Sequence, residues 1–127
     1  MRILAASALV CALIVLPSCG SSRPKLYSLE KTKSCLVAKH VPTGGRLDFV
    51  ATTATGGAFK AHFGANFVTV VFGATQTDAN NIYQAYVNFH ARNVGISDVL
   101  RQQQNAVMLW HAHPSDNAAS TVTGCLR

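Results

Sequence analysis

The feature that most constrains the fold is an uncharged apolar run at the start of the chain. Residues 3–16 carry no charge, Arg2 precedes them, and Pro17-Ser18-Cys19 follows. The run is shorter than the roughly 20 residues that a bilayer span needs, and a positive start before an apolar stretch closed by a small residue is typical of an export signal. We therefore expect residues 1–18 to be removed, leaving a single small domain that folds outside the cytoplasm.

The end of this run, Leu16-Pro17-Ser18-Cys19, resembles the lipobox of bacterial lipoproteins. In that family the cysteine is lipidated with acyl chains such as palmitate and becomes the new N-terminus. Pro17 departs from the small residue that the family prefers at its position. The resemblance covers the signal alone, and it implies lipidation at Cys19 and a cell-envelope protein that is membrane-anchored on the extracytoplasmic side.

Two cysteines remain for the folded part of the chain, because Cys11 lies in the signal and Cys19 is the expected lipid site. In an exported, oxidising compartment such a pair usually bonds, so we predict a disulfide between Cys35 and Cys125. Closing a loop of about 90 residues would stabilise a small domain by roughly 4 to 5 kcal/mol. The alternative is a pair of buried free thiols.

The segment after the signal is basic. We predict that residues 19–33, with Arg23, Lys25, Lys31 and Lys33 against Glu30 alone, form a flexible tether before a single domain at 34–127. A basic tether beside a lipid anchor would be attracted to an anionic membrane, although lysines in a linker can also serve solubility alone. Nucleic acid is not expected as a partner, because the bases lie in a linker of an exported chain.

The hydrophobic pattern predicts an α+β domain. The expected elements are a strand at 35–41, an ambiguous piece at 46–55, a hairpin of strands 58–63 and 67–72, a main helix at 75–92, a helical turn at 97–101, a strand at 106–112, a loop at 114–119 and an extended tail at 121–126. With 46–55 as a helix, the order becomes βαββαβ, a ferredoxin-like arrangement with a small antiparallel sheet and a C-terminal tail closed by the disulfide. With 46–52 as a strand, the sheet becomes a meander crossed by one helix.

Two histidines supply a candidate metal site. His111 and His113 alternate along the last predicted strand, so their side chains should project from one face. Imidazoles at this spacing can share zinc or copper, with His40, His62 or Asp116 as further ligands. The alternative is a pair of ordinary histidines at the end of a strand.

Catalytic patterns are weak in this chain. It has no Gly-x-Ser-x-Gly elbow, the predicted domain contains no glutamate, and bridged cysteines cannot act as thiolates. We therefore predict no enzyme, no catalytic residue and no cofactor. A small envelope enzyme with an unrecognised site is the alternative.

Both faces of the predicted sheet are apolar, so each needs a cover. Our prediction is that the second face is covered by the chain's own tail or binds an envelope protein, another copy or an apolar ligand. The residues of that predicted surface are Phe67, Val71, Met108 and Trp110, bordered by Lys60 and His62. The sequence thus favours a lipid-anchored, non-catalytic binding or structural module, with a metal-binding protein that uses His111 and His113 as the alternative.

Overall fold

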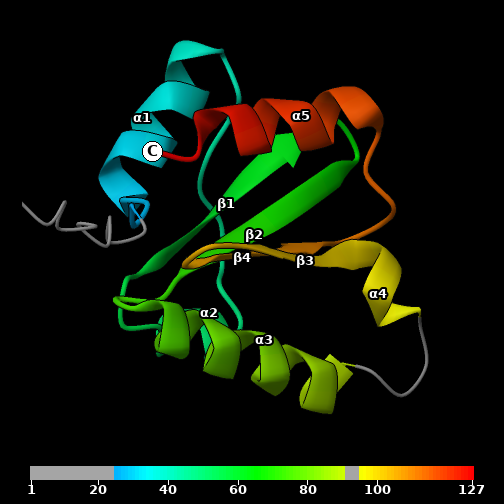
Figure 1. Cartoon of the computed structure of the whole chain (residues 1–127). Helices are drawn as coiled ribbons and strands as arrows, with labels where there is room; N and C mark the ends of the chain where they lie inside the picture. The colour runs from blue at the N-terminus through cyan, green and yellow to red at the C-terminus, as the bar shows by residue number, and fades with distance from the viewer. Residues whose placement is uncertain (1–24, 91–94) are drawn as a thin grey trace, which may run out of the picture.

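The computed structural model describes residues 25–90 and 95–127. In chain order these residues form α1 (Leu29–Ala38), α2 (Phe49–Thr52), β1 (Ala58–Phe63), β2 (Asn66–Phe72), α3 (Gln76–His90), α4 (Ile96–Val99), β3 (Leu100–Gln103), β4 (Ala106–Trp110) and α5 (Asp116–Cys125) (Figure 1). None of the described helices combines the length and the apolar character needed to cross a membrane. The predicted signal and Cys19 lie outside the described residues.

The four strands form one antiparallel sheet in the order β1-β2-β4-β3. The predicted hairpin is confirmed: β1 and β2 are joined by Gly64-Ala65, and Phe59 faces Val70 across them. The predicted α+β class, with a small antiparallel sheet and a disulfide that closes the C-terminal segment, is also confirmed.

One face of the sheet is covered by α1 and α5 (Figure 1). Leu36 of α1 and Val122 of α5 are fully buried against Val68, Met108 and Trp110 of the sheet. The two helices are joined by the Cys35–Cys125 disulfide, whose Cα atoms lie 5.5 Å apart. The C-terminal segment therefore covers a sheet face, as one of the sequence alternatives predicted.

The other face is covered by α2 and α3. The main helix α3 is confirmed, and it buries Ala79, Ile82 and Tyr86 against Val71 and Val107. Its start is fixed by Thr75 and Asp78, because the Asp78 amide donates to the Thr75 hydroxyl and the Thr75 amide donates to the Asp78 carboxylate. The ambiguous piece at 46–55 contains the short helix α2, which Asp48 caps by accepting from the Ala51 amide at 2.9 Å.

The strand predicted at 35–41 is wrong. Residues 35–38 belong to α1, which starts at Leu29 and buries Thr32 and Leu36 one turn apart. Half of the helical pattern of α1 lies before the predicted domain boundary at Ser34, so it was not recognised from the sequence. The tether predicted at 19–33 is accordingly wrong for Leu29–Lys33, which are helical.

The extended tail predicted at 121–126 is also wrong, since residues 116–125 form α5. Ser115 caps the helix by accepting from the Ala118 amide, and Ala118, Val122 and Cys125 form its buried stripe. Its threonines, which favour strands in isolation, donate their hydroxyls to carbonyls four residues back. Burial of the stripe against the sheet outweighs the local preference.

The βαββαβ order is not what the chain adopts. No described strand precedes β1, and the fourth strand is instead β3, the polar segment Leu-Arg-Gln-Gln. It lies at the sheet edge and pairs only with β4, so it needs little apolar character. The sheet therefore consists of two hairpins side by side with helices on both faces.

A buried asparagine fixes the start of the described chain to this sheet. Asn105, in the turn between β3 and β4, is 2% exposed. Its amide donates to the carbonyls of Tyr27 and Gly73, and its oxygen accepts from the Tyr27 amide at 2.7 Å. These bonds position the segment that leads into α1.

Candidate functional site

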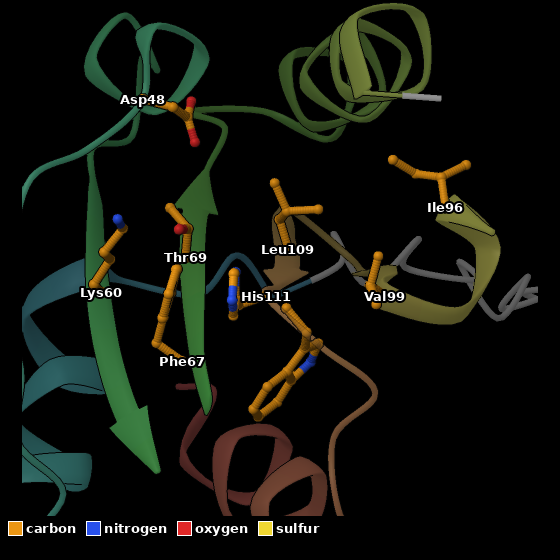
Figure 2. A pocket seen from close by; sticks show the side chains of 9 residues that line it. Asp48, Lys60, Phe67, Thr69, Ile96, Val99, Leu109 and His111 are labelled. Carbon is orange, nitrogen blue, oxygen red and sulfur yellow. The ribbon is translucent and has the colours of Figure 1, made fainter. Parts of the chain in front are cut away.

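A pocket of about 280 Å³ lies on the sheet face that carries α3, beyond the part that this helix covers (Figure 2). Its polar lining consists of Asp48, Lys60, Thr69 and His111. Its apolar lining consists of Phe67, Ile96, Val99, Leu109 and Trp110. The sheet supplies the floor, the residue before α2 borders one end, and α4 forms a side wall.

Strand register explains why these side chains meet. Lys60 is the cross-strand partner of Thr69, and Thr69 is the partner of Leu109, so the three form one row across β1, β2 and β4. In the next row His62 is the partner of Phe67, and the His111 amide donates to the Phe67 carbonyl at 2.9 Å. Directly paired residues share a face of the sheet, so both rows lie on the face that carries the pocket.

The aromatic ring of Phe67 in the second row contacts the ammonium group of Lys60 in the first row. The Lys60 Nζ lies 4.6 Å from the centre of the Phe67 ring, and the His111 ring stacks on Phe67 at 4.7 Å with an angle of 14° between the planes. Because Lys60 lies on β1 and His111 directly follows β4, the strands on either side of β2, Phe67 lies between them (Figure 2). A cation over an aromatic face is attracted by the ring, so Phe67 orients the lysine.

The loop before α2 passes beside Lys60 and His62. Gly44 and Gly45 have φ of 124° and 116°, a region that side chains disfavour. A side chain at Gly45 would start 3.6 Å from the Lys60 Cδ and 3.7 Å from the His62 Nε2. The His62 Nε2 lies 2.8 Å from the Gly44 carbonyl oxygen, which fixes this loop along the edge of β1.

Thr69 adds a second polar group to the floor. Its residue is 2% exposed, and among the described residues its hydroxyl has no hydrogen-bond partner. The hydroxyl therefore lies in the pocket lining as an unused donor and acceptor next to the Lys60 stem. Among the described residues the one buried side-chain polar atom without a partner is the Gln104 Oε1, so the Thr69 hydroxyl is open to the pocket, where a ligand or water would supply its partner.

Asp48 is held at the border by other groups. The Tyr86 hydroxyl lies 3.0 Å from both carboxylate oxygens and donates to the carboxylate, and the Ala51 amide also donates to it. Burial raises the pKa of the Tyr86 hydroxyl far above its usual value, and the charge of Asp48 and the hydrogen bond raise it further. Tyr86 thus remains a proton donor to Asp48, and this carboxylate is directed toward its own helix and α3 rather than toward Lys60.

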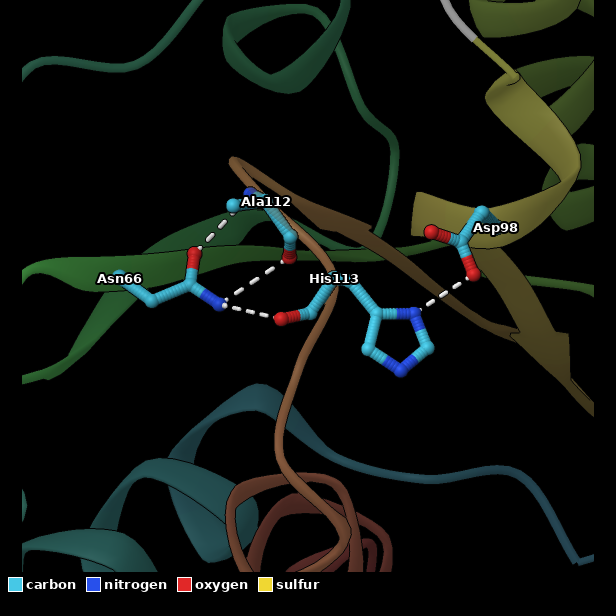
Figure 3. Close-up of polar contacts among 4 residues, drawn as sticks. All are labelled: Asn66, Asp98, Ala112 and His113. Carbon is cyan, nitrogen blue, oxygen red and sulfur yellow. Dashed lines mark hydrogen bonds and ion pairs between the residues drawn. The ribbon is translucent and has the colours of Figure 1, made fainter.

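Helix α4, which forms the side wall, is connected to the segment after β4 through Asp98. Ile96 and Val99 of α4 line the pocket, and Asp98 on the same turn lies 2.6 Å from the His113 Nδ1 (Figure 3). The Asn66 side chain accepts from the Ala112 amide and donates to the Ala112 carbonyl, so it fixes the chain just after β4. His113 is therefore positioned to hold α4 over the floor.

The surface predicted from sequence is divided between the two faces. Val68 is the partner of Trp110 and Val70 is the partner of Met108, so Met108 and Trp110 share the face that α1 and α5 cover. Both are 2% exposed, so neither presents an open apolar surface, although Trp110 still lines the pocket. Val71 lies on the pocket face but is buried under α3. Lys60, His62 and Phe67 are brought together on the pocket face, and Lys60 and Phe67 line the pocket with Trp110.

His111 and His113 have different partners in the structure. Within residues 25–90 and 95–127, no group of three or more histidine, cysteine, aspartate or glutamate side chains is arranged to hold a metal ion. The strand ends at Trp110, so the alternation that would aim both rings in one direction stops there. His111 stacks on Phe67, whereas His113 pairs with Asp98.

Sequence reasoning missed Asp48, Thr69, Ile96, Val99 and Leu109 as site residues. The alternation along each strand does place Thr69 with Phe67, and Leu109 between Met108 and Trp110. Alternation within a strand does not give the register between strands, and this register is what makes Leu109 the cross-strand partner of Thr69. The position of α4 has no local signal beyond its short helical pattern.

The arrangement offers one cation and one hydroxyl beside an apolar wall, which suits binding of a small molecule with both characters. It offers less for covalent chemistry, because nucleophilic catalysis needs a base within hydrogen-bond reach of the nucleophile. The Thr69 hydroxyl has no such base among the described residues. Comparison of the chain with protein-family models, curated proteins and solved structures gave no match.

Proposed function

We propose that the protein is a lipid-anchored, non-catalytic binding module of the cell envelope, and that its ligand is a small molecule with an apolar body and an anionic group. The observation that carries this proposal is a lysine with no close carboxylate beside a hydroxyl with no hydrogen-bond partner among the described residues, on the floor of a pocket that also has an apolar wall. The anchor and the location follow from the resemblance of Leu16–Cys19 to a lipobox.

The anionic group would lie at Lys60 and Thr69. Among the described residues, no carboxylate lies within 4.0 Å of the Lys60 ammonium, which is half-buried against Phe67. A carboxylate or similar group would accept a charge-assisted hydrogen bond from Lys60 and a second bond from the Thr69 hydroxyl. Such bonds are stronger than neutral ones, and a partly enclosed site screens them less than open solvent does.

The apolar body would lie along α4. Ile96, Val99 and Leu109 present partly exposed aliphatic surface beside these donors. The pocket volume is close to the lower end of the range of about 300 to 1,000 Å³ that is usual for ligand sites, which favours a small ligand.

Binding of octanoate and of octanol tests the ligand class, because the two share an eight-carbon chain and differ in charge. The chain has a single tryptophan, Trp110, which borders the pocket and reports occupancy by its fluorescence. Residues 20–127 suffice for the assay, because both buried cores lie within them. We expect octanoate to bind more tightly than octanol. Equal affinities would contradict an anion site.

Two variants locate the anion. Lys60→Met keeps the aliphatic stem and removes the charge, and loss of a charge-assisted bond should weaken octanoate binding about 10- to 100-fold. Octanol binding should change little. Lys39→Met, which removes a charge at the end of α1, is the matched control and should bind octanoate like the unaltered protein. Octanoate binding that survives Lys60→Met unchanged would exclude this site.

The anchor has a separate test. Cys19→Ser in the full chain should move the protein from the membrane fraction to the soluble fraction, because a thioether-linked lipid needs the cysteine sulfur. Membrane association that persists unchanged would count against lipidation, without affecting the pocket.

A further inference from the structure

We infer that the α1 side of the domain lies against an anionic membrane surface, so that the ligand pocket opens away from the bilayer. The surface concerned, called the basic surface here, consists of Lys25, Lys31, Lys33, Lys39 and Arg127. This inference rests on the lipid anchor of the proposed function, and it adds the orientation of the domain and the chemistry of its contact.

Charge is segregated in the folded domain. Glu30 is the one acidic side chain on α1, and Arg127 joins this helix because its amide donates to the Thr32 hydroxyl and its carbonyl accepts from the Ser28 amide. The other described charges are three bases and four aspartates: Arg46, Lys60, Arg101, Asp48, Asp78, Asp98 and Asp116. Asp116 begins α5 at the end of that helix remote from Cys125 and α1. The net positive charge of the described domain thus lies on the α1 side.

The bases of this surface are free to meet lipid phosphates. Among the described residues, the one ion pair is His113 with Asp98, so no carboxylate neutralises a lysine or arginine of the basic surface at close range. Two large apolar side chains are exposed beside them, Leu26 at 42% and Val37 at 53%. Bases that flank exposed aliphatic side chains are typical of surfaces that rest in the interfacial region of a membrane.

The position of the anchor brings this surface to the bilayer. Residues 20–25 join the predicted lipid site to the start of the described chain, and six residues span at most about 20 Å. The range of electrostatic attraction is about 8 to 10 Å at physiological ionic strength. Helix α1 begins at Leu29, shortly after this linker, so it is the helix nearest to the anchor along the chain.

Amine acetylation of the lipidated full-length protein on vesicles tests the orientation, with each lysine quantified by mass spectrometry. Vesicles of phosphatidylcholine alone are compared with vesicles of equal parts phosphatidylcholine and phosphatidylglycerol. We expect Lys31 and Lys39 to be protected on the anionic vesicles. Lys60, in the pocket on the opposite face of the sheet, should label equally on both and acts as the internal control.

Two double variants test whether the charge of the basic surface causes the docking. Lys31→Gln with Lys39→Gln should reduce docking about fivefold for each base removed, so that protection of Lys25 and Lys33 is lost. Arg46→Gln with Arg101→Gln removes the same charge from other surfaces and should leave protection intact. Equal labelling of Lys31 and Lys39 on both vesicles would overturn the inference, as would protection of Lys60. Flotation on neutral vesicles reports the anchor by itself, so failure of lipidation and failure of the orientation are distinguishable.

Discussion

The disulfide between α1 and α5 should provide a large share of the stability of the domain. The two cysteines are separated by 90 positions, and in the chain-entropy relation a closed loop of this length lowers the entropy of the unfolded chain by an amount worth about 4.6 kcal/mol at 25 °C. A domain of this size has a total unfolding free energy of about 5 to 15 kcal/mol. Cys35→Ala with Cys125→Ala should therefore leave a marginal fold.

Urea unfolding of residues 20–127, followed by Trp110 fluorescence, measures this loss. The indole is 2% exposed in the folded state, so unfolding should shift its emission. For an m-value of about 1 to 3 kcal/mol per molar, the midpoint should fall by roughly 1.5 to 4.5 M.

Reduction of the unaltered protein is the matched control, because it breaks the bond and keeps both sulfur atoms in the core. Cys125 is fully buried, so an alanine there also removes packing. The reduced protein and the double variant should lose similar free energy, with the variant slightly weaker. A loss below about 1.5 kcal/mol on reduction would refute the entropic reasoning.

Three further predictions concern the core. Trp110→Ala should destabilise the domain by about 3 to 5 kcal/mol in thermal or urea unfolding followed by circular dichroism, because the ring is buried under α5; a loss below about 1 kcal/mol would contradict that burial. Tyr86→Phe should cost about 1.5 to 3 kcal/mol at neutral pH, since Asp48 loses a donor. The pKa of Tyr86 in the folded state is raised above its unfolded value near 10. The stability that this residue contributes is therefore present below pH 10 and is lost as the pH rises beyond it. Tyr86→Phe should flatten this alkaline decline, whereas Tyr83→Phe should not. Asn105→Ala removes three hydrogen bonds and should lower the unfolding free energy by about 3 kcal/mol. An unfolding free energy equal to that of the unaltered protein would show that the turn needs none of these bonds.

Local sequence patterns predicted the elements whose signals are contained within one segment. The hairpin of β1 and β2 follows from alternation, and α3 follows from a stripe of apolar residues after a capped start. The α+β class followed from the mixture of these two patterns, and the disulfide followed from the two cysteines that remain once Cys11 and Cys19 are assigned to the predicted signal and lipid site.

Patterns failed where local preference and tertiary burial disagree. The β-branched residues Thr121, Val122 and Thr123 favour a strand, yet they lie in α5 because its buried stripe packs on the sheet. The polar residues of β3 favour no strand, yet β4 offers a free edge to pair with. In both cases the deciding contact comes from a segment distant in sequence.

The amino-acid sequence by itself determined the apolar start, the cysteine pair and the need to cover two sheet faces. Only the tertiary structure decided which residues form the site. The pairing of Thr69 with Leu109, rather than with Met108 or Trp110, depends on the register of β2 and β4, and a shift of one residue would exchange the faces of every side chain in β4. That register is fixed by contacts across the sheet and by the helices on both sides, which no single segment of the chain contains.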